Sequence, residues 1–474
     1  MMHALPRTGR LVGPARPVVA AIALTCLAAA PVARAAAQQS ATSTLDAYVA
    51  EAMAKNLGLA QQRLSADQSD AVVRGVRAQL MPQIGIDARY THASGYLLDF
   101  GQLVGPAYQR LNQLTPGAPY PNSVDLRLPL TQETHLRLVQ PVYQPALGAA
   151  TQLARTQRSL QSAQVDAAAR KLAADVRIAY LDLAKATRTE ELYEATLPLV
   201  DENVRVNERL VANGRATPDA TLRARAEQSD VQQQRAAAAE RRNAARGYFN
   251  LLLDRPADAP VEILCDSALD AVFAGPIISV DQAVRAALTG REEFRQIDIG
   301  VDATKAQTKL ATSANLPSVA VALDYGIQGS DYSNPSGHDF ALASVAVQWN
   351  LFNGGQTSAH RQEAAIAGDR LRLQRRELER QVTLEVMTAH EAAEVAHDAI
   401  TTAQARQASA ARSFQLVSRR FAEGLAPLVE FLDARTSDTG ARLNLIVTTY
   451  DYYTRRVELD RAAALYPTHL PSPR

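Results

Sequence analysis

The chain has 474 residues, and its 50 Lys and Arg residues against 49 Asp and Glu residues give a formal net charge of +1 at pH 7. This balance excludes a strongly basic surface for nucleic acid and an acidic disordered tail. Hydrophobic residues make up 47% of the chain and aromatic residues only 5%, so we expect an interior of Ala, Leu and Val, which favours close-packed helices.

The first 37 residues have the layout of a secretory signal peptide. Residues 1–16 contain three arginines and no acidic residue, an apolar run extends from Val18 to Ala30, and small residues follow in two A-x-A patterns. We therefore expect cleavage after Ala35 or Ala37, which would leave the mature chain starting near Gln38.

Two alternatives remain open for this segment. One is an uncleaved membrane anchor, although the apolar run is short for a spanning helix. The other is lipidation of Cys26, although Ala23-Leu24-Thr25 before it is a poor lipobox. Removal of the segment leaves Cys265 as the only cysteine, so no intrachain disulfide can form. No later segment is apolar for 18 residues, so the sequence predicts no transmembrane helix.

A first repeat is predicted over residues 38–254. Its expected elements are a helix over about 45–80 that stops at Pro82, strands over 83–91 and 133–143 separated by a loop over 94–132, a helix over 146–210, a turn at Gly214 and a returning helix of 35–40 residues. Ala, Gln, Arg and Glu fill the long helical span and are tolerated well in helices. At 1.5 Å per residue that span would reach about 90–100 Å.

The same order of elements is predicted again after a connector over residues 255–279, which turn signals of Pro and Gly mark. The second repeat covers residues 280–467, and 468–474 form a C-terminal tail. Its expected elements are a helix over 280–314 that stops at Pro317, strands over 318–328 and 341–351, a helix over 356–422, a turn at Gly424 and a returning helix.

The two halves also match residue by residue at an offset of 210. Residues 209–214 match 419–424, and residues 222–225 match 432–435. Upstream of the turns, apolar residues recur in both halves in steps of three and four, the stripe of a packed helix. A repeat longer than 200 residues indicates gene duplication and excludes a short-period solenoid.

The four extended stretches alternate apolar and polar side chains. The pattern is strict over 83–91, 318–328 and 341–351, and weaker over 133–143. About ten residues with one apolar and one polar face are typical of membrane β-barrel strands, although a soluble sandwich with one wet face gives the same alternation. Four strands cannot close a barrel, and open edges cannot lie in lipid. Strands in a membrane would therefore require several chains to share one barrel.

Long antiparallel helices and four amphipathic strands in an exported, duplicated chain resemble the TolC-like outer-membrane efflux protein family. The most specific marks are the duplicated turn, Val211-x-x-Gly214-x-x-Thr217 and Phe421-x-x-Gly424-x-x-Pro427, and the strand exit from Trp349 to Gly355. The resemblance implies a mixed α and β fold: a homotrimer, with four strands per chain in a twelve-stranded transmembrane barrel and a long helical periplasmic tunnel. It also implies a periplasmic adaptor protein and an inner-membrane transporter as partners.

The resemblance further implies three groups of site residues. The family's acidic constriction, six and nine positions after the second glycine, falls on Glu430 and Asp433. The matching position of the first half is Ala220, with Asp219 beside it. The hairpin tips, where an adaptor would bind, and the transitions from helix to barrel are the other two groups. The tip residues are Arg209, Gly214, Thr217, Arg419, Phe421, Gly424 and Pro427, and the transition residues are Pro82, Pro141, Pro317 and Asn350.

Ordinary structural roles remain open for these residues. Glu430 and Asp433 are also compatible with solvated helix acids. The arginines near the turns, Arg209, Arg215, Arg419 and Arg420, equally suit helix C-termini, where the helix dipole favours cations. Pro82 and Pro317 fit positions where a helix ends without the loss of a ladder hydrogen bond.

Nothing in the sequence indicates catalysis. His390, Glu394 and His397 occupy one helical face at i, i+4 and i+7 and are a candidate metal site, but their repeat mates Tyr180, Ala184 and Thr187 do not preserve it. Motifs of phosphate loops, nucleophile elbows and paired C-x-x-C are absent from the sequence. We expect neither a cofactor nor nucleic acid as a ligand.

Two functions therefore remain. The first is a passive outer-membrane channel, the exit duct of a tripartite efflux pump or a type I secretion system. The second is a soluble periplasmic coiled-coil adaptor or scaffold. The strand alternation favours the channel, because an adaptor has no need of apolar rows such as Val319 to Ile327. The substrate, whether drug, metal or polypeptide, stays open.

Overall fold

The computed structural model describes residues 44–92, 98–117, 120–121, 127–128, 132–329 and 339–466. The predicted signal peptide, with Cys26, and the tail over 468–474 lie outside these residues. The helices are one over residues 44–55, α2 (Leu57–Ala78), α3 (Phe100–Leu114), α4 (Pro145–Ala212), α5 (Pro218–Leu252), α6 (Asp266–Phe273), α7 (Val280–Gly290), α8 (Glu292–Ser313), α9 (Gln356–Ala422) and α10 (Leu428–Ala462). The strands are β1 (Gln83–Tyr90), β2 (Leu98–Asp99), β3 (Arg127–Leu128), β4 (Gln132–Tyr143), β5 (Ser318–Gly329) and β6 (Asp339–Gln348).

The long helices and the four main strands lie within a few residues of their predicted positions. Other details differ from the expectation. The first helix is interrupted at Asn56, because its side-chain Oδ1 accepts a hydrogen bond from the Leu59 N–H at 3.0 Å and starts a new helix there. The helix expected over 280–314 is two helices, α7 and α8, which meet at an extended Arg291. The connector contains α6, and the loop over 94–132 contains α3.

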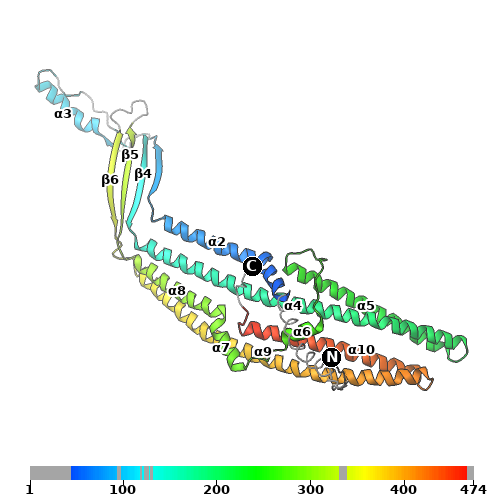
Figure 1. Ribbon diagram of the computed structural model, residues 1–474. Helices are drawn as coiled ribbons and strands as arrows, with labels where there is room; N and C mark the ends of the chain where they lie inside the picture. The colour runs from blue at the N-terminus through cyan, green and yellow to red at the C-terminus, as the bar shows by residue number, and fades with distance from the viewer. Residues whose placement is uncertain are drawn as a thin grey trace, which may run out of the picture. The chain divides into compact units, whose positions relative to one another are not determined.

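The four main strands form one antiparallel sheet in the order β1-β4-β5-β6 (Figure 1). Residues paired across an antiparallel ladder share a face, so the register shows which side chains lie together. Ile86, Leu136, Tyr325 and Ala341 are paired across the sheet and belong to one face. Their neighbours Asp87, His135, Gly326 and Phe340 belong to the other face. The apolar residues predicted on one face of each strand are thus in register.

The described chain divides into two compact units. The sheet unit comprises residues 62–165 and 292–378, and the helical unit comprises 44–61, 166–291 and 379–466. In the helical unit α4 and α5 form one antiparallel hairpin, and α9 and α10 form another (Figure 1). Both long helices, α4 and α9, contribute residues to both units.

In the core of the helical unit, side chains of the long helices hold the connector in place through hydrogen bonds and packing. Tyr180 of α4 is fully buried, and its hydroxyl accepts from the Leu264 N–H at 2.8 Å and donates to the Glu262 carbonyl at 3.1 Å. Burial raises the pKa of Tyr180 to about 12, so the hydroxyl is a neutral donor. Phe249 packs edge-on against the Tyr180 ring at 5.8 Å. The connector is therefore an ordered part of this core.

Candidate functional site

The sheet is inverted relative to a sheet that folds in water. On its apolar face Ile86 is 74% exposed, Tyr325 62% and Val345 70%. On the opposite face the side chains of His135 and Asp324 are only 13% and 11% exposed. A soluble antiparallel sheet buries its apolar face, whereas a membrane barrel strand presents that face to lipid and its polar face to the lumen. Within this chain the apolar face has the exposure that insertion into lipid requires.

The polar face carries a network of charged side chains centred on His135. Its Nε2 lies 3.7 Å from both Asp87 Oδ2 and Asp324 Oδ1, and its Nδ1 lies 3.8 Å from Glu133 Oε1. Arg137 Nε lies 3.6 Å from Asp324 Oδ1, and Arg89 pairs with Glu133. Sequence reasoning missed this cluster because its members come from three strands and only the register brings them together.

The predicted transition residues lie where helix and strand meet. Pro82 directly precedes β1, and Pro317 directly precedes β5. Pro141 lies in β4 opposite Ala320, beyond the last pair with β1, and the β4–β5 register shifts between Pro141 and Tyr143. A residue without an N–H fits this irregular position. Asn350 is exposed and follows the end of β6 by two residues.

Other residues than those predicted make the contacts at the transitions. The Trp349 Nε1–H donates to the Asn315 carbonyl at 3.1 Å, and the Thr357 hydroxyl donates to Asn315 Oδ1 at 2.8 Å. In the first half the Gln140 Nε2–H donates to the Leu80 carbonyl at 3.1 Å. The recurrence of Leu80-Met81-Pro82 as Asn315-Leu316-Pro317 was the sequence signal that could have identified Asn315.

The two hairpin tips close with the same hydrogen bonds. Gly214 and Gly424 have φ of +67° and +74°, the left-handed region that glycine adopts without strain. After them, the Arg215 N–H donates to the Leu210 carbonyl at 2.8 Å, and the Leu425 N–H donates to the Arg420 carbonyl at 2.7 Å. These are the six-residue loops of a Schellman ending. Thr217 and Pro427 then occupy the N-cap positions of α5 and α10 in extended conformations.

The remaining tip residues divide into those with partners and those without. Arg209 pairs with Glu202 at 2.9 Å, and Phe421 stacks on Phe431 with ring centroids 4.8 Å apart. Arg419 is exposed, and its side chain makes neither an ion pair nor a hydrogen bond with another described residue. The side chain of Arg215 is likewise exposed without an ion pair to another described residue, so Arg215 and Arg419 are the tip cations most accessible to a partner protein.

The two acids assigned to the constriction have different surroundings. Glu430 Oε1 accepts from Arg420 Nη1 at 2.7 Å across the tip of the hairpin. Asp433, one turn later on α10, is exposed and has no ion pair with another described residue. The structure thus places both acids on α10 near the tip but leaves only Asp433 uncompensated.

A buried ion pair joins the two hairpins of the helical unit. Arg435 of α10 is only 4% exposed and pairs with Glu227 of α5. Burial lowers the pKa of Arg435, because desolvation penalises the charged guanidinium. Asp438, one turn further on, is 5% exposed and pairs with Arg442 at 2.9 Å. Sequence reasoning missed both buried charges.

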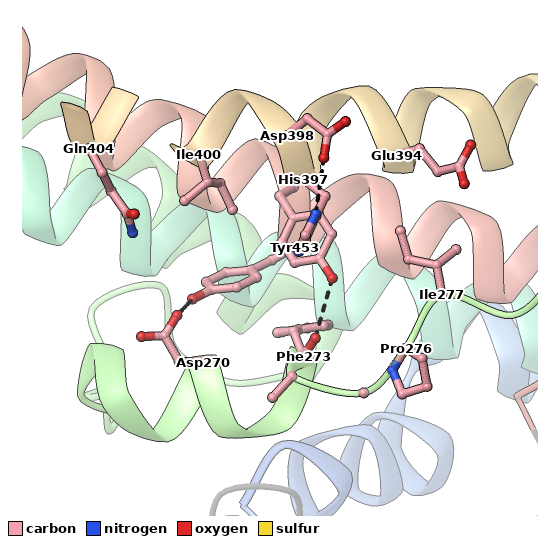
Figure 2. A pocket seen from close by; sticks show the side chains of 13 residues that line it. Asp270, Phe273, Pro276, Ile277, Glu394, His397, Asp398, Ile400, Gln404 and Tyr453 are labelled. Atoms are coloured by element: carbon pink, nitrogen blue, oxygen red, sulfur yellow. Dashed lines mark hydrogen bonds and ion pairs between the residues drawn. The ribbon is translucent and has the colours of Figure 1, made fainter. Parts of the chain in front are cut away.

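A cavity of about 780 Å³ lies in the helical unit between the connector, α9 and α10 (Figure 2). The Tyr453 hydroxyl donates to Asp270 at its edge, and burial raises the pKa of Tyr453, so it stays protonated. His397 packs edge-on against Tyr452 at 5.3 Å, and its Nδ1 lies 3.4 Å from Asp398. The cavity is lined by Asp270, Phe273, Ala274, Gly275, Pro276, Ile277, Glu394, His397, Asp398, Ile400, Gln404, Tyr452 and Tyr453.

The candidate metal ligands on α9 face different partners. His390 Nε2 lies 2.9 Å from the Ile278 carbonyl, and its Nδ1 lies 3.4 Å from Glu394. His397 instead faces Asp398. Among the described residues, no three His, Cys, Asp or Glu side chains are grouped so that they could hold a metal ion. In the same part of the chain, no helix is long and apolar enough to cross a membrane.

The chain is similar in sequence to one known family and in structure to several solved channels. Residues 283–465 match the family described as outer membrane efflux protein. The solved structure of CusC, a protein that undergoes transmembrane channel formation, is 18% identical, with a TM-score of 0.72 and coverage of 89% of this chain and 92% of CusC. The CmeC outer membrane channel of Campylobacter jejuni is 16% identical, with a TM-score of 0.71 and coverage of 89% of this chain and 85% of CmeC.

A third solved structure extends the comparison. The outer membrane protein VceC of Vibrio cholerae is 17% identical, with a TM-score of 0.67 and coverage of 89% of this chain and 96% of VceC. No curated protein matches the chain by sequence. The predicted resemblance to the TolC-like outer-membrane efflux protein family is confirmed by these matches, and the fold is that of solved outer membrane channels.

Proposed function

With its resemblance to outer membrane efflux proteins confirmed, we propose that three copies of this chain form a passive exit duct through the outer membrane. Each copy contributes β1, β4, β5 and β6 to a shared barrel of twelve strands. The helical hairpins continue the duct into the periplasm. The solved relatives named as outer membrane channels support a role in transport and not in catalysis.

The observation that carries this proposal is the inverted sheet. Its apolar residues are in register over four strands, and Ile86, Tyr325 and Val345 stay exposed, while His135 and Asp324 on the polar face are mostly buried. The sheet also ends in two edges, β1 and β6, that have no ladder partner among the described residues. Lipid tolerates no open edge, so β1 of one copy must pair with β6 of the next. A closed ring of identical chains meets that requirement.

The alternative function, a soluble periplasmic adaptor or scaffold, would have to cover the exposed apolar face in water. Ile84, Ile86 and Val347, between 65% and 74% exposed, would then form part of a large apolar surface facing solvent. Soluble proteins rarely keep such a surface uncovered. The inverted sheet therefore favours the duct.

The duct would work with two partners. We infer that the tips around Gly214 and Gly424 meet a periplasmic adaptor protein, to which the exposed Arg419 is accessible. The adaptor in turn would connect the duct to an inner-membrane transporter, in a tripartite efflux pump or a type I secretion system. Glu430 and Asp433 would form the constriction at the tip, where rings of carboxylates concentrate cations.

The duct also gives a role to the proposed organisation of the chain. Residues 1–37 would direct export and then be removed. The exported chain would contain two repeats, 38–254 and 280–467, that arose by duplication. Each repeat supplies two strands and one hairpin. Three chains then supply six similar units around the tunnel axis.

Native mass and cell fractionation test the proposal. Three chains of 51.1 kDa, each without its signal peptide, amount to about 140 kDa. The duct requires a particle of this mass in the outer-membrane fraction after extraction in mild detergent. A monomer or dimer in the soluble periplasmic fraction would support the adaptor instead.

A further inference from the structure

The charged residues on the polar face of the sheet converge on a single titratable side chain, His135. Carboxylates from three strands surround it: Asp87 on β1, Glu133 on β4 and Asp324 on β5, each 3.7–3.8 Å from an imidazole nitrogen. β6 faces it with Phe340, whose ring centroid is 6.0 Å away. His135 thus has acidic neighbours on three strands and an aromatic neighbour on the fourth.

The backbone is built closely around His135. Gly326 lies directly opposite in the β4–β5 register. A Cβ at Gly326 would be 2.4 Å from His135 Cβ and 2.2 Å from the Thr134 carbonyl oxygen, distances that real Cβ atoms do not show. Only glycine permits this approach, and it leaves the imidazole side chain 13% exposed.

No hydrogen bond to another described residue fixes the His135 Nδ1 atom in one protonation state. His135 Nδ1 and Asp324 Oδ1 are both buried, and neither makes a hydrogen bond with another described residue. Their contacts with charged groups, at 3.6–3.8 Å, are longer than hydrogen bonds. A proton on the imidazole therefore acts on its neighbours mainly through charge.

That proton decides the net charge of the face. The charged side chains on the polar face of the described strands are Asp87, Arg89, Glu133, Arg137 and Asp324, together with His135. Three carboxylates and two guanidinium groups sum to −1 when His135 is neutral and to 0 when it is protonated. Histidine is the side chain whose charge ordinarily changes between pH 5 and 8.

We propose that His135 makes the ion selectivity of the duct dependent on pH. This role rests on the proposed function, in which the polar face lines the lumen of a threefold barrel. Three copies then place a net charge of −3 on this band of the lumen, which spans three successive levels of paired residues, with neutral histidines and 0 with protonated ones. A ring of negative charge favours cations over anions, so protonation of His135 removes that preference.

Reversal potentials in planar lipid bilayers test this role. Purified trimers are measured under a KCl gradient at pH 7.5 and 5.5, in a background with Glu430→Ala and Asp433→Ala so that the tip carboxylates do not contribute. We expect the permeability ratio of K⁺ to Cl⁻ to fall at least about twofold between the two pH values. His135→Gln, which stays neutral, should keep the high ratio at both.

Two further variants separate charge from structure. Asp87→Asn, at a side chain 63% exposed, sets the face to 0 with neutral His135 and should give at pH 7.5 the ratio that the parent shows at pH 5.5. His360→Gln is the matched control, because His360 on α9 is 55% exposed with one acidic neighbour, Glu363, at 3.3 Å. It should leave the pH dependence intact.

The outcomes distinguish this role from the duct itself. Absence of channels in every variant would overturn the proposed duct and this role with it. Channels in which His135→Gln keeps the full pH dependence, or in which Asp87→Asn leaves the ratio at pH 7.5 unchanged, would overturn the role of His135 and leave the duct standing.

Discussion

Arg420 Nη1 lies 2.7 Å from Glu430 Oε1, across the tip of the hairpin that α9 and α10 form. The guanidinium offsets the carboxylate charge, whereas Asp433 one turn away has no such partner among the described residues. The two acids of the proposed constriction are therefore not equivalent. Of these two acids, Asp433 should contribute most of the negative field.

Replacement of the two acids should show this difference. We expect Asp433→Ala to lower the preference for cations at least about twofold, and Glu430→Ala to change it less, because Arg420 already offsets Glu430. The double variant should also raise the single-channel conductance by relaxing the tip. Arg420→Gln is the control, since it frees the Glu430 charge and should strengthen the preference. Equal effects of the two single variants would contradict the assignment.

The turn at Gly424 should depend on glycine for its backbone alone. A Cβ there would meet no atom within 4 Å, but φ is +74°. Gly424→Ala should therefore lower stability by about 1 kcal/mol through backbone strain. Gly440→Ala, on the following helix and equally free of contacts, should raise stability by about 0.5–1 kcal/mol. Thermal unfolding of the two trimers measures the difference, and a shift of the same sign in both would contradict it.

Gly326 should be needed for the sheet to form. Gly326→Ala places a Cβ 2.2 Å from the Thr134 carbonyl oxygen and forces β4 and β5 apart. We expect the amount of trimer in the outer membrane to fall several-fold, since overpacking costs about 1–3 kcal/mol or more. Gly85→Ala on β1 is the matched control, because no atom lies within 4 Å of its Cβ position. Normal assembly of Gly326→Ala would show that the register is wrong.

The link between the first helix and the connector should weaken in acid. Arg255 Nε donates to Glu51 Oε1 at 2.8 Å, and this hydrogen bond lowers the pKa of Glu51 below its ordinary 4.5. Because the folded-state pKa is the lower one, the stabilisation is complete above pH 4.5 and is lost as the pH falls through the lowered value. Glu51→Gln should cost about 1 kcal/mol at pH 7.

Apparent melting temperatures between pH 7 and 3 measure this pH dependence. The gap between the parent and Glu51→Gln should close toward the acid end of the series. Lys55→Gln, which removes the exposed partner of Glu51 at 3.0 Å, is the control and should change little. A gap that stays constant with pH would show that the Glu51 carboxylate contributes through packing alone.

The elements that the sequence predicts well are those in which a periodic pattern of apolar residues persists over a long run. Apolar stripes mark α4 and α9, and alternation marks β5 and β6. Each pattern extends over ten residues or more, so many side chains contribute to the same prediction. The break at Asn56 depends on one capping side chain, and the break at Arg291 on one extended residue. Such single-residue events have no periodic signal.

The sites were harder to predict than the fold. The β4 alternation is weak because Gln132, Thr134 and Gln140 lie on the apolar face, so the partners of His135 emerge only from the register with β1 and β5. The pairing of Arg420 with Glu430 likewise depends on how the Gly424 turn brings two helices together. Contacts of this kind are set by geometry that no local pattern encodes.

The central claim is that β1 of one chain pairs with β6 of the next. Cysteine pairs, one at Ile84 or Ile86 and one at Val345 or Val347, test it in a Cys265→Ser background. Within one chain β1 and β6 are opposite edges of a four-stranded sheet, about 14 Å apart at ordinary strand spacing, too far for a disulfide. We predict that at least one pair gives covalent trimers on a non-reducing gel, while the single-cysteine variants do not. Monomers from every pair, in protein that fractionates with the outer membrane, would contradict the shared barrel.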